Sequence, residues 1–229
     1  MKRAAAVLVV AAAPLFTHAG RPLTTEDVAV VEDKACQLES WIDRTRDATQ
    51  GWVVPACNFG AGIEWQAGFA RTHEDSRSMF SSAYVQAKKV LREPEPAGWG
   101  LGVVLGLVRS PLRSSHRGYE DPYAIAVITV PTPAGTLIHG NAGWSHDRER
   151  RASTTTWGLA AEHPIAERWF AVGEAFGDDR TNPFYRAGVR VTATKGLDFD
   201  LTVVTRPGGS RADRYLSAGL TWQGPPFLP

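Results

Sequence analysis

The stretch YRAGVRVTATKGLDFDLTVV, residues 185–204, alternates apolar and polar side chains along two successive segments. Successive side chains of a β-strand point to opposite faces, so each segment has the pattern of a strand with one apolar and one polar face. The pair Lys195-Gly196 between them is typical of a tight turn. The stretch therefore predicts an antiparallel hairpin whose polar face carries Arg186, Arg190, Asp198 and Asp200.

Alternation of the same kind recurs along the chain. We expect twelve strands, at residues 35–44, 51–58, 61–71, 79–90, 98–108, 123–131, 136–146, 153–162, 167–177, 184–194, 197–205 and 213–222. A soluble β-sandwich or a lipocalin-like binder would also bury one face of each strand, so alternation alone leaves that class open. The connections between strands favour a membrane barrel, because longer charged loops alternate with mostly shorter turns, as in outer-membrane barrels with long external loops and short periplasmic turns. We predict an all-β fold, a single antiparallel transmembrane β-barrel of about twelve strands over residues 35–222, with a tail at 223–229.

The first residues have the three parts of a secretory signal. Met1-Lys2-Arg3 is positively charged, residues 4–15 are apolar, and Thr17-His18-Ala19 before Gly20 forms a cleavage site. Residues 1–19 are therefore predicted to be a signal peptide, which indicates export and an outer-membrane location for a barrel. Residues 20–34 are predicted to form a periplasmic N-terminal arm; a disordered leader and a short plug or lid across the barrel mouth are the alternatives.

Composition excludes several classes of protein. The chain has 229 residues and a formal net charge of +1, so it has no electrostatic footprint for nucleic acid. After the signal, no run approaches the roughly 18 apolar residues of a membrane helix. The two cysteines are too few for a metal site, and no cofactor is implied.

Cys36 and Cys57 are predicted to form a disulfide across a hairpin. An even pair of cysteines in an exported protein favours a disulfide. The hairpin register that places Trp41 opposite Trp52 also places Cys36 opposite Cys57. Two free thiols or a redox role are the alternatives, and the sequence has no CxxC motif to support the latter.

Aromatic residues gather near the ends of the expected strands. Nine fall near the predicted external ends: Trp41, Trp52, Phe80, Tyr123, Trp144, Phe176, Phe184, Tyr185 and Tyr215. Phe59, Trp99, Trp169 and Trp222 fall near the periplasmic ends. This distribution predicts two aromatic girdles at the membrane interfaces, although aromatic residues also simply favour strands.

The charged residues of the polar faces are the candidate functional residues. Arg186, Arg190, Asp198 and Asp200 should face the lumen together, and Glu64, Gln66, Lys88, Glu162 and Glu174 extend this set on other strands. Opposite charges within reach would hold the wall in register, which is the structural interpretation that we favour. A constriction that selects solutes by charge is the alternative. Arg186, Arg190, Asp198, Asp200, Glu64 and Lys88 are thus the lumen or constriction candidates.

A catalytic interpretation has less support. His139, Asn141 and Ser145 share one strand face, as a hydrolytic set at a barrel wall would require, whereas His146 lies on the other face and no Gly-x-Ser-x-Gly motif occurs. We predict no catalytic residues. The loop 109–122, basic in its first half, and the loop with Arg148, Glu149, Arg150 and Arg151 could meet lipopolysaccharide phosphates, or could simply be solvated.

Three segments carry a resemblance to a known group of proteins. They are Arg21-Pro22-Leu23-Thr24-Thr25-Glu26-Asp27 after the signal, Cys36-Gln37-Leu38-Glu39 in the first strand, and the block from Gly173 to Trp222. This pattern resembles proteobacterial outer-membrane β-barrel proteins described as transporter-like or porin-like. The chain departs from such barrels at its end, where Leu228-Pro229 follows Phe227 in place of a terminal aromatic residue.

The resemblance implies an envelope location and a barrel. The expected partners of such a barrel are outer-membrane lipids, lipopolysaccharide and the barrel-assembly machinery. We expect a passive channel or transporter-like protein for small solutes. A non-conducting structural or ligand-binding barrel is the alternative, followed by a lipid-modifying enzyme or a soluble periplasmic binder.

Overall fold

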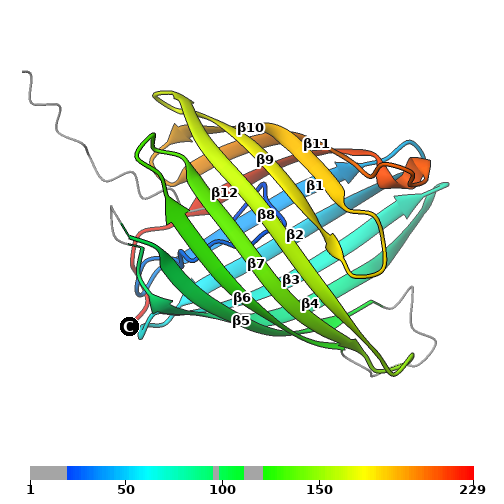
Figure 1. Cartoon of the computed structure of the whole chain (residues 1–229), viewed down its shortest axis with the longest axis horizontal. Coiled ribbons are helices and arrows are strands. Elements are labelled where there is room, and N and C mark those ends of the chain that lie inside the picture. The colour runs from blue at the N-terminus through cyan, green and yellow to red at the C-terminus, as the bar shows by residue number, and fades with distance from the viewer. Residues whose placement is uncertain (1–19, 95–97, 111–120) are drawn as a thin grey trace, which may run out of the picture.

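A computed structural model describes residues 20–94, 98–110 and 121–229 of the chain. These residues form a closed antiparallel β-barrel in which each strand pairs with its neighbours in the sequence and β12 pairs with β1 (Figure 1). The strands are β1 Cys36–Arg44, β2 Ala48–Asn58, β3 Ile63–Glu74, β4 Arg77–Arg92, β5 Gly100–Arg109, β6 Asp121–Pro131, β7 Leu137–Asp147, β8 Ala152–Ala166, β9 Trp169–Asp178, β10 Phe184–Thr194, β11 Leu197–Thr205 and β12 Tyr215–Gln223. A short 3-10 helix, η1 Arg211–Asp213, precedes β12.

The twelve predicted strands are all present, and the predicted fold class is confirmed. The main differences lie at strand ends. β4 and β8 extend beyond the predicted ranges, to Arg92 and to Ala166. The backbone hydrogen bonds between two paired strands do not depend on alternation of their side chains, so pairing can continue past the last alternating residue. The alternation of apolar and polar residues therefore underestimates the length of long strands. Among the described residues, no helix is long and apolar enough to cross a membrane.

The two faces of the wall differ as the alternation requires. Leu201, Val203 and Phe199 of β11 are among many large apolar side chains exposed on the outside. Asp200 and Thr202, between them in sequence, are buried inside. In β10 the inward residues are Arg186 and Arg190, which lie opposite Val204 and Asp200 in the register. The barrel thus presents an apolar outer belt and a polar interior, which is the arrangement of an outer-membrane barrel.

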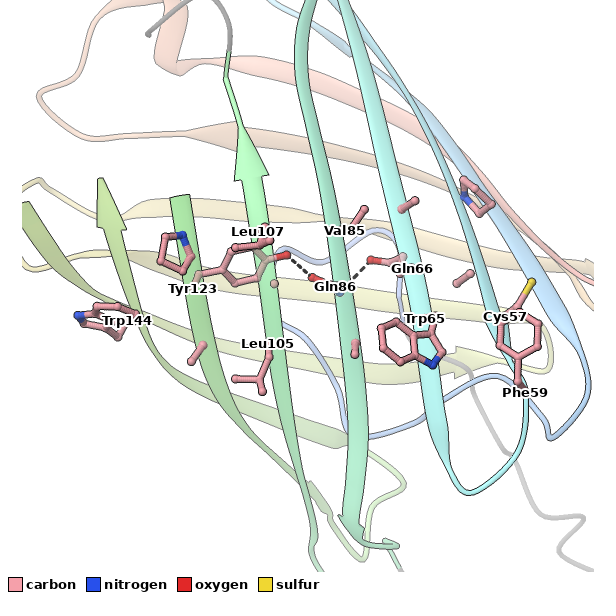
Figure 2. A pocket seen from close by; sticks show the side chains of 17 residues that line it. Cys57, Phe59, Trp65, Gln66, Val85, Gln86, Leu105, Leu107, Tyr123 and Trp144 are labelled. Atoms are coloured by element: carbon pink, nitrogen blue, oxygen red, sulfur yellow. Dashed lines mark hydrogen bonds between the residues drawn. The ribbon is translucent and has the colours of Figure 1, made fainter. Parts of the chain in front are cut away.

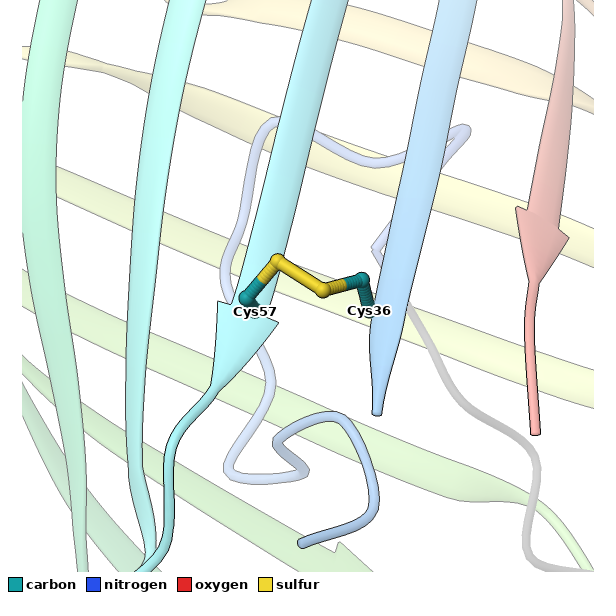
Figure 3. Close-up of a disulfide and its surroundings, with 2 residues drawn as sticks. All are labelled: Cys36 and Cys57. Carbon is teal, nitrogen blue, oxygen red and sulfur yellow. A yellow bond between two sulfur atoms is a disulfide. The ribbon is translucent and has the colours of Figure 1, made fainter. Parts of the chain in front are cut away.

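The first hairpin contains the predicted disulfide. Cys36 of β1 lies opposite Cys57 of β2, in the same register that places Trp41 opposite Trp52, and the two sulfur atoms are bonded (Figure 3). Cys36 and Cys57 alternate with the buried residues Gln37, Ala56 and Asn58, so the bridge lies on the outer face of the wall. The prediction of a cross-strand disulfide is confirmed.

Most of the segment 20–34 lies inside the barrel (Figure 1), and its exposed last residues, Glu32, Asp33 and Lys34, precede β1. We call this segment the arm. Its backbone enters beside the end of β2, where the Lys34 N–H donates to the Asn58 carbonyl over 2.8 Å. Arg21, Thr25, Asp27, Val28 and Val31 of the arm are buried. The side of the membrane that each barrel end faces stays a prediction.

Candidate functional site: the lumen and its arm

The arm is fixed to the lumen wall by hydrogen bonds to its backbone amides. The N–H of Glu26 donates to Asn141 Oδ1 over 2.7 Å, and Asn141 Nδ2 donates back to the Glu26 carbonyl over 2.8 Å. The N–H of Val28 donates to Thr129 Oγ1 over 3.1 Å, and the N–H of Val31 donates to Glu64 Oε2 over 2.8 Å. The N–H of Thr25 donates to Glu174. Buried amides without partners are costly, so these wall residues are needed to keep an irregular segment in the interior.

Arg21 anchors the first part of the arm on the opposite side of the lumen. Its Nη2 lies 2.8 Å from Asp200 Oδ1 of β11 and 2.9 Å from Ser217 Oγ of β12. The guanidinium also lies over the ring of Trp41, 4.6 Å from the centroid. Because the arm contacts β6 and β7 at Val28 and Glu26 and β11 and β12 at Arg21, it crosses the interior from one side to the other.

An apolar cluster around Val28 also lies in the interior. The Val28 side chain is fully buried against Val90, Val104 and Val127, which come from β4, β5 and β6. Full burial of a valine is worth roughly 1.5–3 kcal/mol. The contact therefore fixes the middle of the arm independently of the charged groups around it.

Lys88 of β4 is the centre of an acidic cluster. Its Nζ lies 3.3 Å from Glu26 Oε2, 3.5 Å from Asp27 Oδ1 and 3.9 Å from Glu64 Oε1. Two of these carboxylates belong to the arm and one to the wall, so the ammonium joins them. The predicted lumen residues Glu64 and Lys88 are both buried here.

The other predicted lumen residues are also placed by the structure. Arg186, Arg190 and Asp200 are buried, and Asp198 is half-buried. Their ion pairs, however, differ from the expected Arg–Asp pairs: Arg190 Nη2 lies 2.7 Å from Glu162 Oε2, Arg186 Nε lies 3.7 Å from Glu174 Oε2, and Asp200 pairs with Arg21. The interpretation as a clamp or a constriction is not decided by these contacts and stays a prediction.

A chain of polar contacts links the arm to Arg190. Thr129 Oγ1, which accepts the Val28 N–H, lies 2.9 Å from His139 Nδ1. His139 Nε2 lies 3.6 Å from Glu162 Oε1, and the other oxygen of Glu162 contacts Arg190. His139 and Glu162 are buried, so the position of the arm and the packing of this part of the wall depend on one another.

A chamber of about 430 Å³ remains beside the arm. Its lining includes the arm residues Arg21 and Glu26, the wall residues Glu39, Asp43 and Arg186, and several glutamines and aromatic rings: Gln50, Gln66, Gln86, Trp41, Trp52, Tyr84, Tyr123, Phe176 and Tyr215. Trp41 and Trp52 stack with their centroids 5.3 Å apart. The chamber thus combines charged groups, amides and aromatic rings, which suits small polar molecules.

The aromatic residues of the chamber correct part of the prediction of an external girdle, whereas Phe80, Trp144 and Tyr185 of the same set are exposed. Trp41, Trp52, Tyr123, Phe176 and Tyr215 line the interior, although the sequence pattern suggested a membrane interface. Each is separated by an even number of residues from a buried residue of its own strand, as Trp41 is from Glu39. Such residues lie on the same face of a strand, so the aromatic side chain points inward. The four aromatic residues predicted near the periplasmic ends, Phe59, Trp99, Trp169 and Trp222, are exposed as a girdle requires.

The wall formed by β2–β7 has a groove of about 810 Å³, with a lining dominated by exposed apolar side chains (Figure 2). Trp65, Val85 and Leu105 line it, and they belong to the exposed outer face. Figure 2 also shows a polar chain on the same strands, in which Tyr123 Oη donates to Gln86 Oε1 over 2.6 Å and Gln86 Nε2 donates to Gln66 Oε1 over 2.8 Å. The wall therefore separates an apolar outer surface from a hydrogen-bonded inner one.

The residues considered for catalysis are used in structural contacts. His139 contacts Thr129 and Glu162, and Asn141 holds the arm backbone. Outside the barrel, His146 Nδ1 lies 3.1 Å from Ser153 Oγ. Within the described ranges, no cluster of three or more His, Cys, Asp or Glu side chains has a metal-binding arrangement.

The two basic loops stay predictions as lipopolysaccharide sites. Most of the loop 109–122 lies outside the described residues. In the other loop, Arg150 Nη1 lies 3.6 Å from Asp147 Oδ2, and the Arg148 N–H donates to Asp121 over 2.9 Å.

Solved structures with the same fold are outer-membrane porins and channels. The KdgM porin in complex with disordered oligogalacturonate has a TM-score of 0.65 and 6% sequence identity, with 81% of this chain and 98% of that chain covered. The COG4313 outer membrane channel from Pseudomonas putida F1 has a TM-score of 0.59 and 10% identity, covering 88% and 99%. The NanC porin has a TM-score of 0.57 and 7% identity, covering 82% and 98%. All three are described as porins or channels, and at such identities they establish the fold alone.

Comparison at the level of sequence gives one match. A family model described as "Uncharacterised conserved protein UCP029691" matches residues 6–223. No curated protein matches the chain.

Proposed function

Because the chain belongs to the family described as "Uncharacterised conserved protein UCP029691" and has the barrel fold of outer-membrane channels, we propose that it is a passive outer-membrane channel for small polar solutes. It reaches the membrane after export through a signal peptide at residues 1–19. The observation that carries the proposal is the polar chamber of about 430 Å³ inside a wall whose outer face is apolar.

The arm determines whether this channel is open. It crosses the lumen and is held by Thr129 of β6 and Asn141 of β7, by Glu64 of β3, and by Asp200 of β11 and Ser217 of β12. A segment held by so many contacts leaves rarely, so we expect low conductance when the arm is in place. Solutes would pass mainly when the arm is displaced.

The alternative is a barrel that binds a ligand without conducting. The observation that favours it is the same arm, because the Val28 side chain is fully buried against Val90, Val104 and Val127 and fills part of the lumen. The two functions predict different results when the arm is removed: a channel gains conductance, whereas a ligand-binding barrel remains closed to ions.

Conductance in planar lipid bilayers tests the proposal. A variant that lacks residues 21–30 should form channels of clearly higher conductance than the full chain, because Arg21, Glu26 and Val28 no longer cross the lumen. A variant with only Asn141→Ala, which loses the two bonds to Glu26, should open more often than the full chain and keep the wall intact. Absence of conductance in all three proteins would reject the channel and support the ligand-binding barrel.

A further inference from the structure

The first described residue of the arm lies against a buried carboxylate. The Arg21 N–H donates to Glu39 Oε1 over 3.2 Å, and a Cβ added at Gly20 would overlap the same oxygen. Glu39 belongs to the inner face of β1, and its relative exposure is 6%. The backbone of Gly20 is therefore in direct contact with a carboxylate in the interior of the barrel.

Glu39 has no ion pair within the part of the chain that the structure describes. Its hydrogen bonds come from the Arg21 amide and, over 3.5 Å, from Gln37 Nε2. The guanidinium of Arg21 is directed to Asp200 and Ser217 instead. A buried carboxylate without a cation is costly, and the surrounding structure normally supplies one.

The wider charge balance of the interior points the same way. The buried carboxylates are Asp27, Glu39, Glu64, Glu162, Glu174 and Asp200, and they outnumber the buried cations, which are Arg21, Lys88, Arg186 and Arg190. One more positive charge beside Glu39 would reduce this imbalance and would give Glu39 the cation that it lacks.

We propose that the peptide bond between Ala19 and Gly20 is hydrolysed during export and that the new α-ammonium group of Gly20 forms an ion pair with Glu39 in the lumen. Water is added across the bond, so that Ala19 leaves with a carboxylate and Gly20 keeps the amine. An α-amino group has an ordinary pKa of about 8, so the amine is protonated at neutral pH. The inference rests on the export proposed above.

The identity of residue 20 fits this role. Glycine leaves room for the carboxylate of Glu39 in its present position, whereas a side chain at residue 20 would displace it. The ion pair would hold the free end of the arm, as the bond from the Lys34 amide to Asn58 holds the other end. Cleavage of the signal peptide would thus do more than release the protein from its leader, because the new N-terminus would also fix the arm in the lumen.

Mass spectrometry of the protein purified from the outer membrane gives the first test. We expect an intact mass that corresponds to a chain beginning at Gly20. A different N-terminus on an exported barrel would overturn the inference and leave the channel proposal standing. A chain that keeps residues 1–19 and fractionates away from the outer membrane would instead refute the export on which both rest.

A double-mutant cycle gives the second test. One glycine inserted between Ala19 and Gly20 places the new N-terminal ammonium one residue further from Arg21, which is about 3.5 Å when the chain is extended. The insertion and Glu39→Gln should each lower the temperature at which the folded barrel converts to its unfolded form on gels. Together they should lower it no further than the more damaging of the two, because both remove the same ion pair.

Glu64→Gln is the matched control for this cycle. Glu64 is also buried and also accepts a hydrogen bond from an arm amide, but its ion pair is with Lys88. Its effect should add to that of the insertion. If the effect of Glu39→Gln on the unfolding temperature adds to that of the insertion as fully as the effect of Glu64→Gln does, the proposed ion pair does not form.

Discussion

At the scale of single residues, the long charged side chains of the lumen select partners that the strand pattern does not show. Arg190 lies opposite Asp200 in the β10–β11 register, yet its guanidinium pairs with Glu162 of β8, two strands away. Asp200 is bound by Arg21 of the arm. Alternation determines which face a residue is on, but an arginine can span neighbouring strands. The inward set was therefore predictable from sequence, and its ion pairs were not.

Arg190 is the residue at which the clamp and the selectivity interpretations can be separated. Its Nη2 forms an ion pair with Glu162 Oε2 over 2.7 Å, and its guanidinium lies 4.9 Å from the ring centroid of Phe170. We expect Arg190→Glu to destabilise the barrel by about 3–5 kcal/mol, the cost of leaving a buried charge without its partner. The heat resistance of the folded form should fall.

Ion selectivity is the second measurement on the same variant. If Arg190 is a clamp, reversal potentials in the arm-shortened channel should stay unchanged by Arg190→Glu. Asp198→Asn serves as the control, because Asp198 is only half-buried and should change heat resistance little. A shift toward cations in Arg190→Glu with unchanged heat resistance would favour the constriction.

At the scale of structural elements, the first hairpin shows what a sequence can specify in full. Two coincidences, Trp41 with Trp52 and Cys36 with Cys57, predicted a single register, and the structure has it. The same residues also show the limit of the pattern. Trp41 is two residues from Glu39 and so lies on the same inner face of β1, where its indole stacks on Trp52. The prediction of a membrane girdle considered only the position of Trp41 along the strand and not the face on which it lies.

The disulfide of this hairpin is expected to stabilise the barrel from outside the lumen. Cys36 and Cys57 are 21 residues apart, and closing a loop of this size is worth about 3 kcal/mol in the chain-entropy model. Cys36→Ser combined with Cys57→Ser should lower the urea concentration at which the barrel unfolds. Conductance should be unaltered, since the bridge lies on the outer face, and a change in conductance would contradict that placement.

The arm is the element that the sequence described least well. It has no alternation, so the pattern left its place open between a free leader and a plug, and the contacts of Val28 and Glu26 inside the barrel come from the structure alone. A signal for it exists in the wall. At Gly219, on the inner face of β12, an added Cβ would lie 2.8 Å from Arg21 Nη2 of the arm and 2.9 Å from Trp41 Cβ of β1, so both the arm and the neighbouring strand crowd this position. Without the arm in view, such glycines look like ordinary features of a crowded lumen.

At the scale of the whole molecule, the alternation of every strand produces one continuous apolar belt, and the belt is what a membrane location requires. Leu201, near the middle of β11, has a relative exposure of 48% and alternates with the buried residues Asp200 and Thr202. If this face meets lipid, Leu201→Arg should destabilise the folded barrel by roughly 2–4 kcal/mol, because an arginine at the bilayer midplane is that costly. Urea unfolding in lipid vesicles measures the difference.

Thr205→Arg is the control that makes this measurement specific to a membrane. Thr205 is exposed on the same face of the same strand but is its last residue, where the cost of arginine falls to about 0–1 kcal/mol in a bilayer. In water, two exposed positions on one strand would tolerate arginine about equally. A large difference between the two variants in vesicles therefore indicates that the outer face of β11 spans the hydrocarbon layer, and equal stability of the two would show that the apolar belt does not meet lipid.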